Sequence, residues 1–243
     1  MYVSVDVGGT NIRVAGSRSL THLEFVASPQ RYVNSQNYQE DIDFIVEAAR
    51  SCADGEIIDC LGICLPGTLS PDMGTIIFAQ NLAWWEGQPF ADTLSKALGC
   101  KVCVGHDGVA AGMGEAYYGS IQPQFYYLIW GTGIGGSEVC SNQDYGFDSE
   151  EINWQEMFSA WEDDCGGRTI AHKYGKSTHD FSTAEWDEVK GRFTVHLKKF
   201  VEKTRVRNIV FGGGLAIKHR DFLENIPIER MDSILVTKFG NDS

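Results

Sequence analysis

The sequence predicts an α/β protein of two lobes that share one duplicated architecture. Apolar, β-prone segments alternate with helical segments along the 243 residues, which is the pattern of a mixed α/β fold. A strand at 2–7, a glycine-rich tip and a returning strand form a predicted hairpin, and a similar unit begins at residue 125. No low-complexity linker divides the chain. The order of elements therefore predicts lobes at 1–115 and 116–243, with a cleft between them.

The elements of the first lobe follow from apolar spacing and from the glycines that bound it. Residues 38–53 favour a helix, because Ile42, Ile45 and Ala49 fall on one helical face. The remaining predicted elements are a strand at 60–67, a helix at 89–99 that ends at Gly99, a strand at 101–105 and a helix at 108–118.

The second lobe is predicted from the same signals. Residues 184–204 favour a long amphipathic helix, and the polar, acidic stretch 141–164 is expected to be an irregular loop. The remaining predicted elements are a strand at 125–130, a helix start at 165–175, a strand at 207–211, a helical segment after residue 214 and a last strand near 234–239.

Composition excludes several classes of protein. The net charge of −13 argues against a basic groove for nucleic acid, so we expect no nucleic-acid partner. No apolar run reaches the roughly 18 residues of a membrane helix, and the first residues lack the pattern of a signal peptide. The seven cysteines are then expected to be reduced thiols in a cytoplasmic protein.

Cys100 and Cys103 form a CxxC pair, which is found in redox and zinc sites. No second CxxC follows, and the segment has the pattern of a short buried strand in which residues three apart face opposite sides. We therefore interpret the pair as structural.

Three glycine-rich turns each follow an apolar strand, and such turns let the backbone approach phosphate oxygens closely. Thr10 and Thr132 add hydroxyl donors, and Asp6 could hold Mg²⁺ through water. One such turn alone is more often an ordinary hairpin, but three in one chain indicate a phosphate site. None of them fits a Walker A loop or a Rossmann fingerprint. The residues of the turns are Gly8, Gly9, Thr10, Gly131, Thr132, Gly133, Gly212, Gly213 and Gly214.

Asp107 follows a short predicted strand and precedes a helix of small residues. A carboxylate at such a strand end can accept the proton of an attacking hydroxyl group. The alternative is that Asp107 only caps the helix, and position alone favours the cap.

Six segments in order resemble the ROK family of sugar kinases. They are DVGGTNIR at 6–13, LGICLPGTLS at 61–70, NLAWWEG at 81–87, HDGVAAGMGEAYYG at 106–119, GTGIGG at 131–136 and FGGGLA at 211–216. The resemblance implies an actin-like ATPase (ribonuclease H-like) fold of two lobes that bind ATP with Mg²⁺. It implies that Asn11 and Arg13 belong to the first phosphate loop and that Asp107 is the catalytic base. The sugar site that it implies contains Gly67, Asn81, His106, Asp107, Glu151 and Trp154.

The chain departs from the family pattern at several positions. His106 stands where the family has Asn, and Trp154 where it has His. The cysteine cluster of the family's structural zinc is missing, so we predict no zinc site. His106 could hydrogen-bond the sugar or line the wall of the site. Trp154 could stack on the sugar or fill the core of a loop.

The function that the resemblance implies is ATP-dependent phosphorylation of a sugar hydroxyl, with a small-molecule sugar as substrate. The alternative is a non-catalytic sugar or nucleotide sensor on the same fold, although retained Asp6 and Asp107 argue against it. A transcriptional repressor of the family would need a DNA-binding segment ahead of the first strand, and none is seen. Family members commonly dimerise and usually continue past residue 243 with a helix that packs on the first lobe. We therefore expect a homodimer.

Overall fold

The computed structural model describes residues 1–21, 26, 30–119, 121, 124–139 and 153–238. The chain divides into two compact units, Met1–Ala110 and Ala111–Ser243. This division falls inside helix α3 (Asp107–Tyr118), which also contains the predicted lobe boundary after residue 115.

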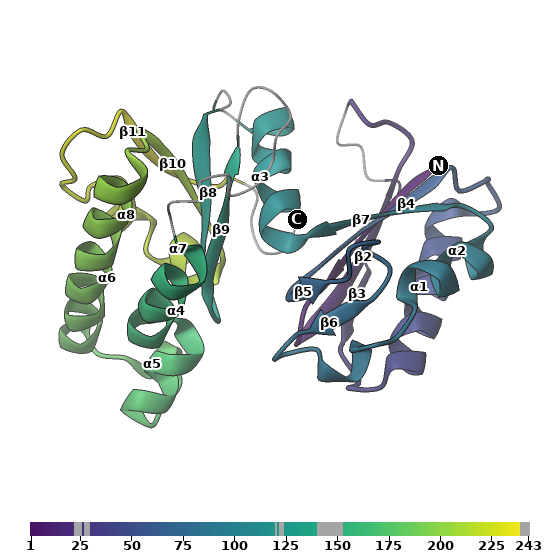
Figure 1. Ribbon diagram of the computed structural model, residues 1–243, viewed down its shortest axis with the longest axis horizontal. Helices are drawn as coiled ribbons and strands as arrows, with labels where there is room; N and C mark the ends of the chain where they lie inside the picture. The colour runs from purple at the N-terminus through teal and green to yellow at the C-terminus, as the bar shows by residue number, and fades with distance from the viewer. Residues whose placement is uncertain (22–25, 27–29, 120, 122–123, 140–152, 239–243) are drawn as a thin grey trace. The chain divides into compact units, whose positions relative to one another are not determined.

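A five-stranded sheet forms the centre of the first unit, with the strand order β3-β2-β1-β4-β7 (Figure 1). Its three antiparallel strands form a meander, and β4 and β7 run parallel to β1. The carboxyl ends of β1, β4 and β7 therefore meet at one edge of the sheet. The strands are β1 (Tyr2–Val7), β2 (Asn11–Ser17), β3 (Gln30–Val33), β4 (Cys60–Leu65) and β7 (Lys101–His106).

Helix α1 (Tyr38–Ala53) begins where the side chain of Asn37 accepts hydrogen bonds from the next turn, and ends at Asp54 in a left-handed conformation. Its buried apolar face packs on β1 and β2, as the spacing predicts. Helix α2 (Phe90–Leu98) packs on β7 and ends at Gly99, whose φ of 67° suits glycine (Figure 1). The short strands β5 (Thr68–Leu69) and β6 (Ile76–Phe78) and the 3₁₀ turn η1 (Ala83–Trp85) complete the described part of this unit.

The second unit repeats the central arrangement of the first. Its sheet has the order β11-β10-β8-β9, in which β8 and β9 form an antiparallel hairpin and β10 and β11 run parallel to β8. The first unit has the same hairpin with two parallel strands beside it, so the predicted duplication is observed in the sheets. The strands are β8 (Phe125–Trp130), β9 (Ile134–Val139), β10 (Asn208–Gly212) and β11 (Ser233–Val236).

The two faces of β8 pack against different layers, as expected for a strand of period two. Phe125 and Tyr127 pack with apolar residues of α3, whereas Tyr126, Leu128 and Trp130 face the main core of the unit. That core is rich in aromatic residues. Its helices are α4 (Trp154–Cys165), α5 (Gly167–Tyr174), α6 (Thr183–Thr204), α7 (Gly214–Lys218) and α8 (Arg220–Glu224), with the 3₁₀ turn η2 (Thr178–Asp180).

The prediction of an irregular loop over 141–164 is wrong for its last part, because residues 154–164 belong to helix α4. Asn153 caps this helix by accepting the N–H of Glu156, and Phe158, Trp161 and Cys165 point toward the core at helical spacing. The acidic residues between them hid this apolar face from sequence analysis.

Candidate functional site

The first glycine-rich turn joins β1 to β2. Its ends are held by a hydrogen bond from the N–H of Gly8 to the carbonyl oxygen of Asn11, at 2.8 Å. Asn34 fixes the turn from outside, because its side chain donates to the Gly8 carbonyl at 3.0 Å and its backbone N–H donates to the Thr10 carbonyl at 2.9 Å. Asn34 is 8% exposed and lies just after β3. Asn34 was not predicted as a site residue, since nothing in the local sequence relates it to the turn.

Asp6 and Arg13 lie directly opposite each other in the β1–β2 hairpin. The guanidinium group of Arg13 donates to Oδ2 of Asp6 at 2.7 Å, so two residues predicted to bind nucleotide form an ion pair. The other oxygen, Oδ1, faces the thiol of Cys64 on the neighbouring strand β4, with Sγ at 3.7 Å. The carboxylate is thus oriented from both sides.

Asp107 lies at the end of β7 as the first residue of α3, and its Oδ1 accepts the N–H of Gly108 at 2.7 Å. This bond agrees with the alternative in which Asp107 caps the helix. It does not conflict with a role as base, because it uses only one of the two carboxylate oxygens. The side chain is exposed, yet the surrounding protein removes enough water to raise the pKa of Asp107 above its ordinary value. The negative charge of Asp6 raises this pKa further, whereas Gly108 and the charge of His106 lower it.

Asp6, Cys64 and Asp107 therefore lie together at the carboxyl edge of three neighbouring parallel strands. The register supports this, because Asp6 pairs with Cys64 and Cys64 pairs with Gly105, two residues before Asp107. Burial, followed by the two carboxylates, raises the pKa of the Cys64 thiol well above its ordinary value. The thiol stays protonated and acts as a weak donor.

The residues of this edge fit a bound magnesium ion by their chemistry. Mg²⁺ is commonly held by one or two carboxylates, water and substrate phosphates. Asp6 provides a half-exposed carboxylate beside the glycine turn, and Arg13 holds only one of its two oxygens. Among the residues that the structure describes, no group of three or more His, Cys, Asp or Glu is arranged to hold a metal by itself.

Among the predicted sugar residues of the first unit, Asn81 lies against the same turn. A Cβ added to Gly9 would come within 2.6 Å of both Cβ and the carbonyl oxygen of Asn81, so these segments are in direct contact. Gly67 has a φ of 95°, and a Cβ there would come within 2.4 Å of the Phe78 carbonyl oxygen, so glycine is required. His106 is partly buried and lies opposite Leu65 at the end of β7.

Asp41 of α1 holds the segment that carries Asn81. This carboxylate is fully buried, and its Oδ2 accepts the indole N–H groups of Trp84 at 2.8 Å and Trp85 at 2.9 Å. Its Oδ1 accepts the hydroxyl and the backbone N–H of Ser35, at 3.0 and 3.2 Å. Asp41 thus joins the Asn81 segment to the residue that follows Asn34. Neither this contact nor its role was predicted.

The second and third glycine-rich turns are neighbours in the second unit, because they follow the parallel strands β8 and β10. A Cβ on Gly131 would be 3.8 Å from the nitrogen of Gly214, and one on Gly213 would be 2.6 Å from the Trp130 carbonyl oxygen. Gly213 also has a φ of 92°, which favours glycine. The structure thus brings together two turns that are distant in sequence.

The second turn is fixed by α4 and α5. The N–H groups of Gly167 and Arg168 donate to the carbonyl oxygens of Gly131 and Thr132, at 2.8 and 2.9 Å. Glu162 accepts the N–H of Ile134 at 2.9 Å, and its carboxylate fills the space beside Gly133. Glu162 was not predicted, because its segment was expected to be a loop.

Two predicted sugar residues, Glu151 and Trp154, are not placed beside the first glycine-rich turn by the structure. Glu151 lies outside the described residues. Trp154 is the first residue of α4, and its ring lies among the rings of Tyr126, Phe158 and Phe200. These contacts match the packing alternative.

A sequence model of the ROK family matches residues 2–146. The glucokinase of Thermotoga maritima is 33% identical over 141 residues, which are 56% of this chain and 44% of the relative. The chain thus matches less than half the length of this relative.

Solved structures extend the likeness to nearly the whole chain. A ROK family glucokinase from Streptomyces griseus, in complex with glucose and AMPPNP, has a TM-score of 0.75 at 19% identity and covers 98% of this chain and 95% of its own. An inorganic polyphosphate/ATP-glucomannokinase from an Arthrobacter strain has a TM-score of 0.77 at 20% identity and covers 99% and 93%. At such identities the likeness concerns the fold, and it confirms the predicted actin-like ATPase fold. No described helix is both long and apolar enough to span a bilayer.

Proposed function

Since the chain belongs to the ROK family, we propose that it transfers the γ-phosphoryl group of ATP to a hydroxyl group of a sugar. The observation that carries this proposal is the pair of carboxylates, Asp6 and Asp107, at the carboxyl edge of β1 and β7. In open α/β sheets this edge is where ligands bind. Asp6 lies beside a glycine-rich turn, and Asp107 lies at the start of helix α3. The first position suits a metal ligand near the phosphates, and the second suits a base near the acceptor hydroxyl.

Asp107 is the proposed general base. It would accept the proton of the attacking sugar hydroxyl, and its raised pKa brings its basicity closer to the working pH. Asp6 would hold Mg²⁺ through water, and the ion would supply charge neutralisation for the phosphates. Arg13 and Cys64 would keep the Asp6 carboxylate in its orientation.

The glycine-rich turns are the proposed nucleotide site. The turn at Gly8–Thr10, with Asn11 and Arg13 after it, and the turn at Gly131–Gly133 would bind phosphates through backbone N–H groups. The turn at Gly212–Gly214 would contact the adenosine side. Transfer of this kind is driven chiefly by positioning and by charge neutralisation, which is what backbone donors and a metal provide.

The proposed sugar site consists of Gly67, Asn81, His106 and Asp107 of the first unit. The contact between Gly9 and Asn81 would place the sugar next to the phosphate turn. We do not include Trp154, because its ring packs in the aromatic core of the second unit.

The test is a turnover assay with Mg-ATP and a panel of hexoses, N-acetylhexosamines and ketoses. We expect ADP formation that depends on one class of sugar, together with a product heavier by one phosphoryl group. Binding of sugar or nucleotide without any such product across the panel would contradict the proposal and favour the sensor.

A further inference from the structure

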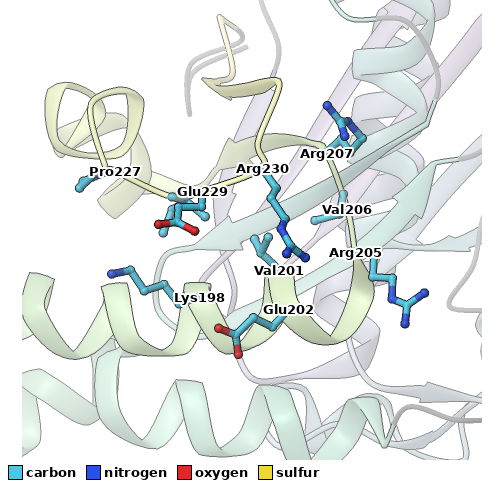
Figure 2. A pocket seen from close by; sticks show the side chains of 10 residues that line it. Lys198, Val201, Glu202, Arg205, Val206, Arg207, Pro227, Glu229 and Arg230 are labelled. Atoms are coloured by element: carbon cyan, nitrogen blue, oxygen red, sulfur yellow. The ribbon is translucent and has the colours of Figure 1, made fainter.

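A groove of about 1030 Å³ in the second unit lies between the last turns of α6 and the segment 227–230 (Figure 2). Its arginines do not converge on one point, because Arg205 is directed away from Arg230. The third, Arg207, is paired with Asp232. These side chains therefore make no common binding centre. Two thiol groups in the first unit, in contrast, converge on each other.

The two thiols belong to Cys60 of β4 and Cys103 of β7, and their Sγ atoms are 3.4 Å apart. The strands are parallel neighbours, and Cys103 pairs with Gly62, two residues after Cys60 (Figure 1). Residues two apart in a strand face the same side, so both side chains lie on one face of the sheet. The fold thus brings together two thiols that are 43 residues apart in sequence.

This face of the sheet is open around the two thiols in the described structure. Cys103 is exposed, and Cys60 is partly buried. A Cβ at Gly62 would meet only the Val3 carbonyl oxygen, at 4.0 Å, and a Cβ at Gly105 would meet nothing within 4 Å. The sulfur of Cys103 is therefore accessible to a small reagent from solution.

The CxxC partner of Cys103 in the sequence, Cys100, is placed differently. Cys100 is 9% exposed and lies just before β7, and the sulfur that contacts Cys103 is that of Cys60. Burial and the neighbouring Cys103 raise the pKa of the Cys60 thiol to about 11, so Cys60 keeps its proton and can donate it to the Cys103 sulfur. Cys103 is therefore the sulfur that reacts first.

The thiol pair is separate from the carboxyl edge that carries Asp6 and Asp107. Cys60 lies four residues before Cys64, and Cys103 lies four residues before Asp107. At about 3.3 Å per residue along a strand, the pair is roughly 13 Å from that edge. Its chemistry is therefore independent of the proposed phosphoryl transfer.

We propose that Cys60 and Cys103 form a reversible redox site that reacts with low-molecular-weight disulfides such as oxidised glutathione. The Cys103 thiolate attacks one sulfur of the reagent, which forms a mixed disulfide and releases one thiol. The Cys60 sulfur then attacks the Cys103 sulfur, which forms the Cys60–Cys103 bond and releases the second thiol. The protein is oxidised by two electrons, the reagent is reduced to two thiols, and the protons of Cys60 and Cys103 end on those thiols.

The test incubates the full native chain with oxidised glutathione, blocks the remaining thiols with iodoacetamide and maps the peptides by mass spectrometry. In the parent we expect the peptides of Cys60 and Cys103 to be joined, and dithiothreitol to separate them, because exposed disulfides are reduced readily. A bond between Cys103 and Cys100, or a glutathione adduct that persists at Cys103 of the parent, would overturn the proposal. So would disulfide-linked pairs of chains as the main product on a non-reducing gel.

Serine variants separate the roles of the two thiols. Cys60→Ser should stop after the first step, so the glutathione adduct at Cys103 should exceed that of the parent by about tenfold or more. Cys103→Ser should form neither the adduct nor the bond. The control is Cys52→Ser, which changes a buried thiol of the core and should react like the parent. Equal adduct at Cys103 in Cys60→Ser and the parent would contradict the role of Cys60. The parent's peptide map decides the proposal even where a variant fails to fold.

Discussion

Three side chains, those of Asp6, Cys64 and Asp107, lie together at the carboxyl edge of the first sheet. Cys64 lies between the strands that lead to Asp6 and Asp107, and its thiol contacts Asp6 at 3.7 Å. Because burial and both carboxylates keep this thiol protonated, it adds no further negative charge to the site. The raised pKa of Asp107 follows from the same crowding, since loss of water and the charge of Asp6 both disfavour its ionised form.

The pKa of Asp107 leads to a prediction for the pH dependence of the reaction. The base must be deprotonated, so kcat/KM should fall as the pH drops through the raised pKa of Asp107. The charge of His106 lowers that pKa, and His106→Gln should therefore move the acidic limb of the profile to higher pH. The measurement is kcat/KM against pH for both proteins. The control is His179→Gln, which changes an exposed histidine of the second unit. If the acidic limb of the pH profile stays in place in His106→Gln, the effect given to His106 on the pKa of Asp107 is contradicted.

At the scale of elements, the first glycine-rich turn and the Asn81 segment form one contact surface. We expect Gly9→Ala to weaken both ATP binding and sugar binding, because the added Cβ would come within 2.6 Å of Asn81. Binding of each ligand is measured by calorimetry. Gly62→Ala is the matched control, since a Cβ at that glycine meets only the Val3 carbonyl oxygen at 4.0 Å. Unchanged affinity for both ligands in Gly9→Ala would show that this turn lies outside the site.

Helix α1 supports the same segment through Asp41. Asp41→Ala should lower the free energy of unfolding by roughly 2–4 kcal/mol, because it leaves two indole N–H groups without their acceptor. Denaturant unfolding measures this change. Asp43→Ala, on the exposed face of the same helix, should change stability by less than about 0.5 kcal/mol. Similar losses in the two variants would contradict the role given to Asp41.

The elements that could be predicted are those whose signals are local. The apolar spacing of 38–53 and the glycine after residue 98 are enough to specify α1 and the end of α2. Helix α4 was missed because Glu156, Glu162 and its other acidic residues interrupt the apolar pattern. Asn34, Asp41 and Glu162 were missed as supporting residues of the site for another reason. Each acts on a segment distant in sequence, and no local pattern marks such contacts.

At the scale of the whole molecule, the chain repeats one sheet topology in two units. The glycine-rich turns follow equivalent strands in each, since β1 and β8 both begin a hairpin whose tip is rich in glycine. This repetition explains why similar turns half a chain apart could be recognised before their surroundings were known. The carboxylates of Asp6 and Asp107 belong to the first unit, and the proposed adenosine turn at Gly212–Gly214 belongs to the second.

We propose a homodimer, as the resemblance to the family led us to expect, because closed symmetric dimers are the commonest assembly of soluble proteins. Light scattering coupled to size-exclusion chromatography should give twice the chain mass at micromolar concentration. A single monomeric species, with and without Mg-ATP and sugar, would contradict the dimer and leave the proposed reaction untouched.

The measurement that tests the central proposal most directly compares the parent with Asp107→Asn. In the sugar-dependent assay we expect the variant to lose phosphorylation by a factor of about 10² or more, because a general base acts on the acceptor hydroxyl. Its affinity for Mg-ATP, measured by calorimetry, should stay close to that of the parent, since the lost group does not hold the nucleotide. Turnover of the variant within about threefold of the parent would contradict the assignment of Asp107 as the base.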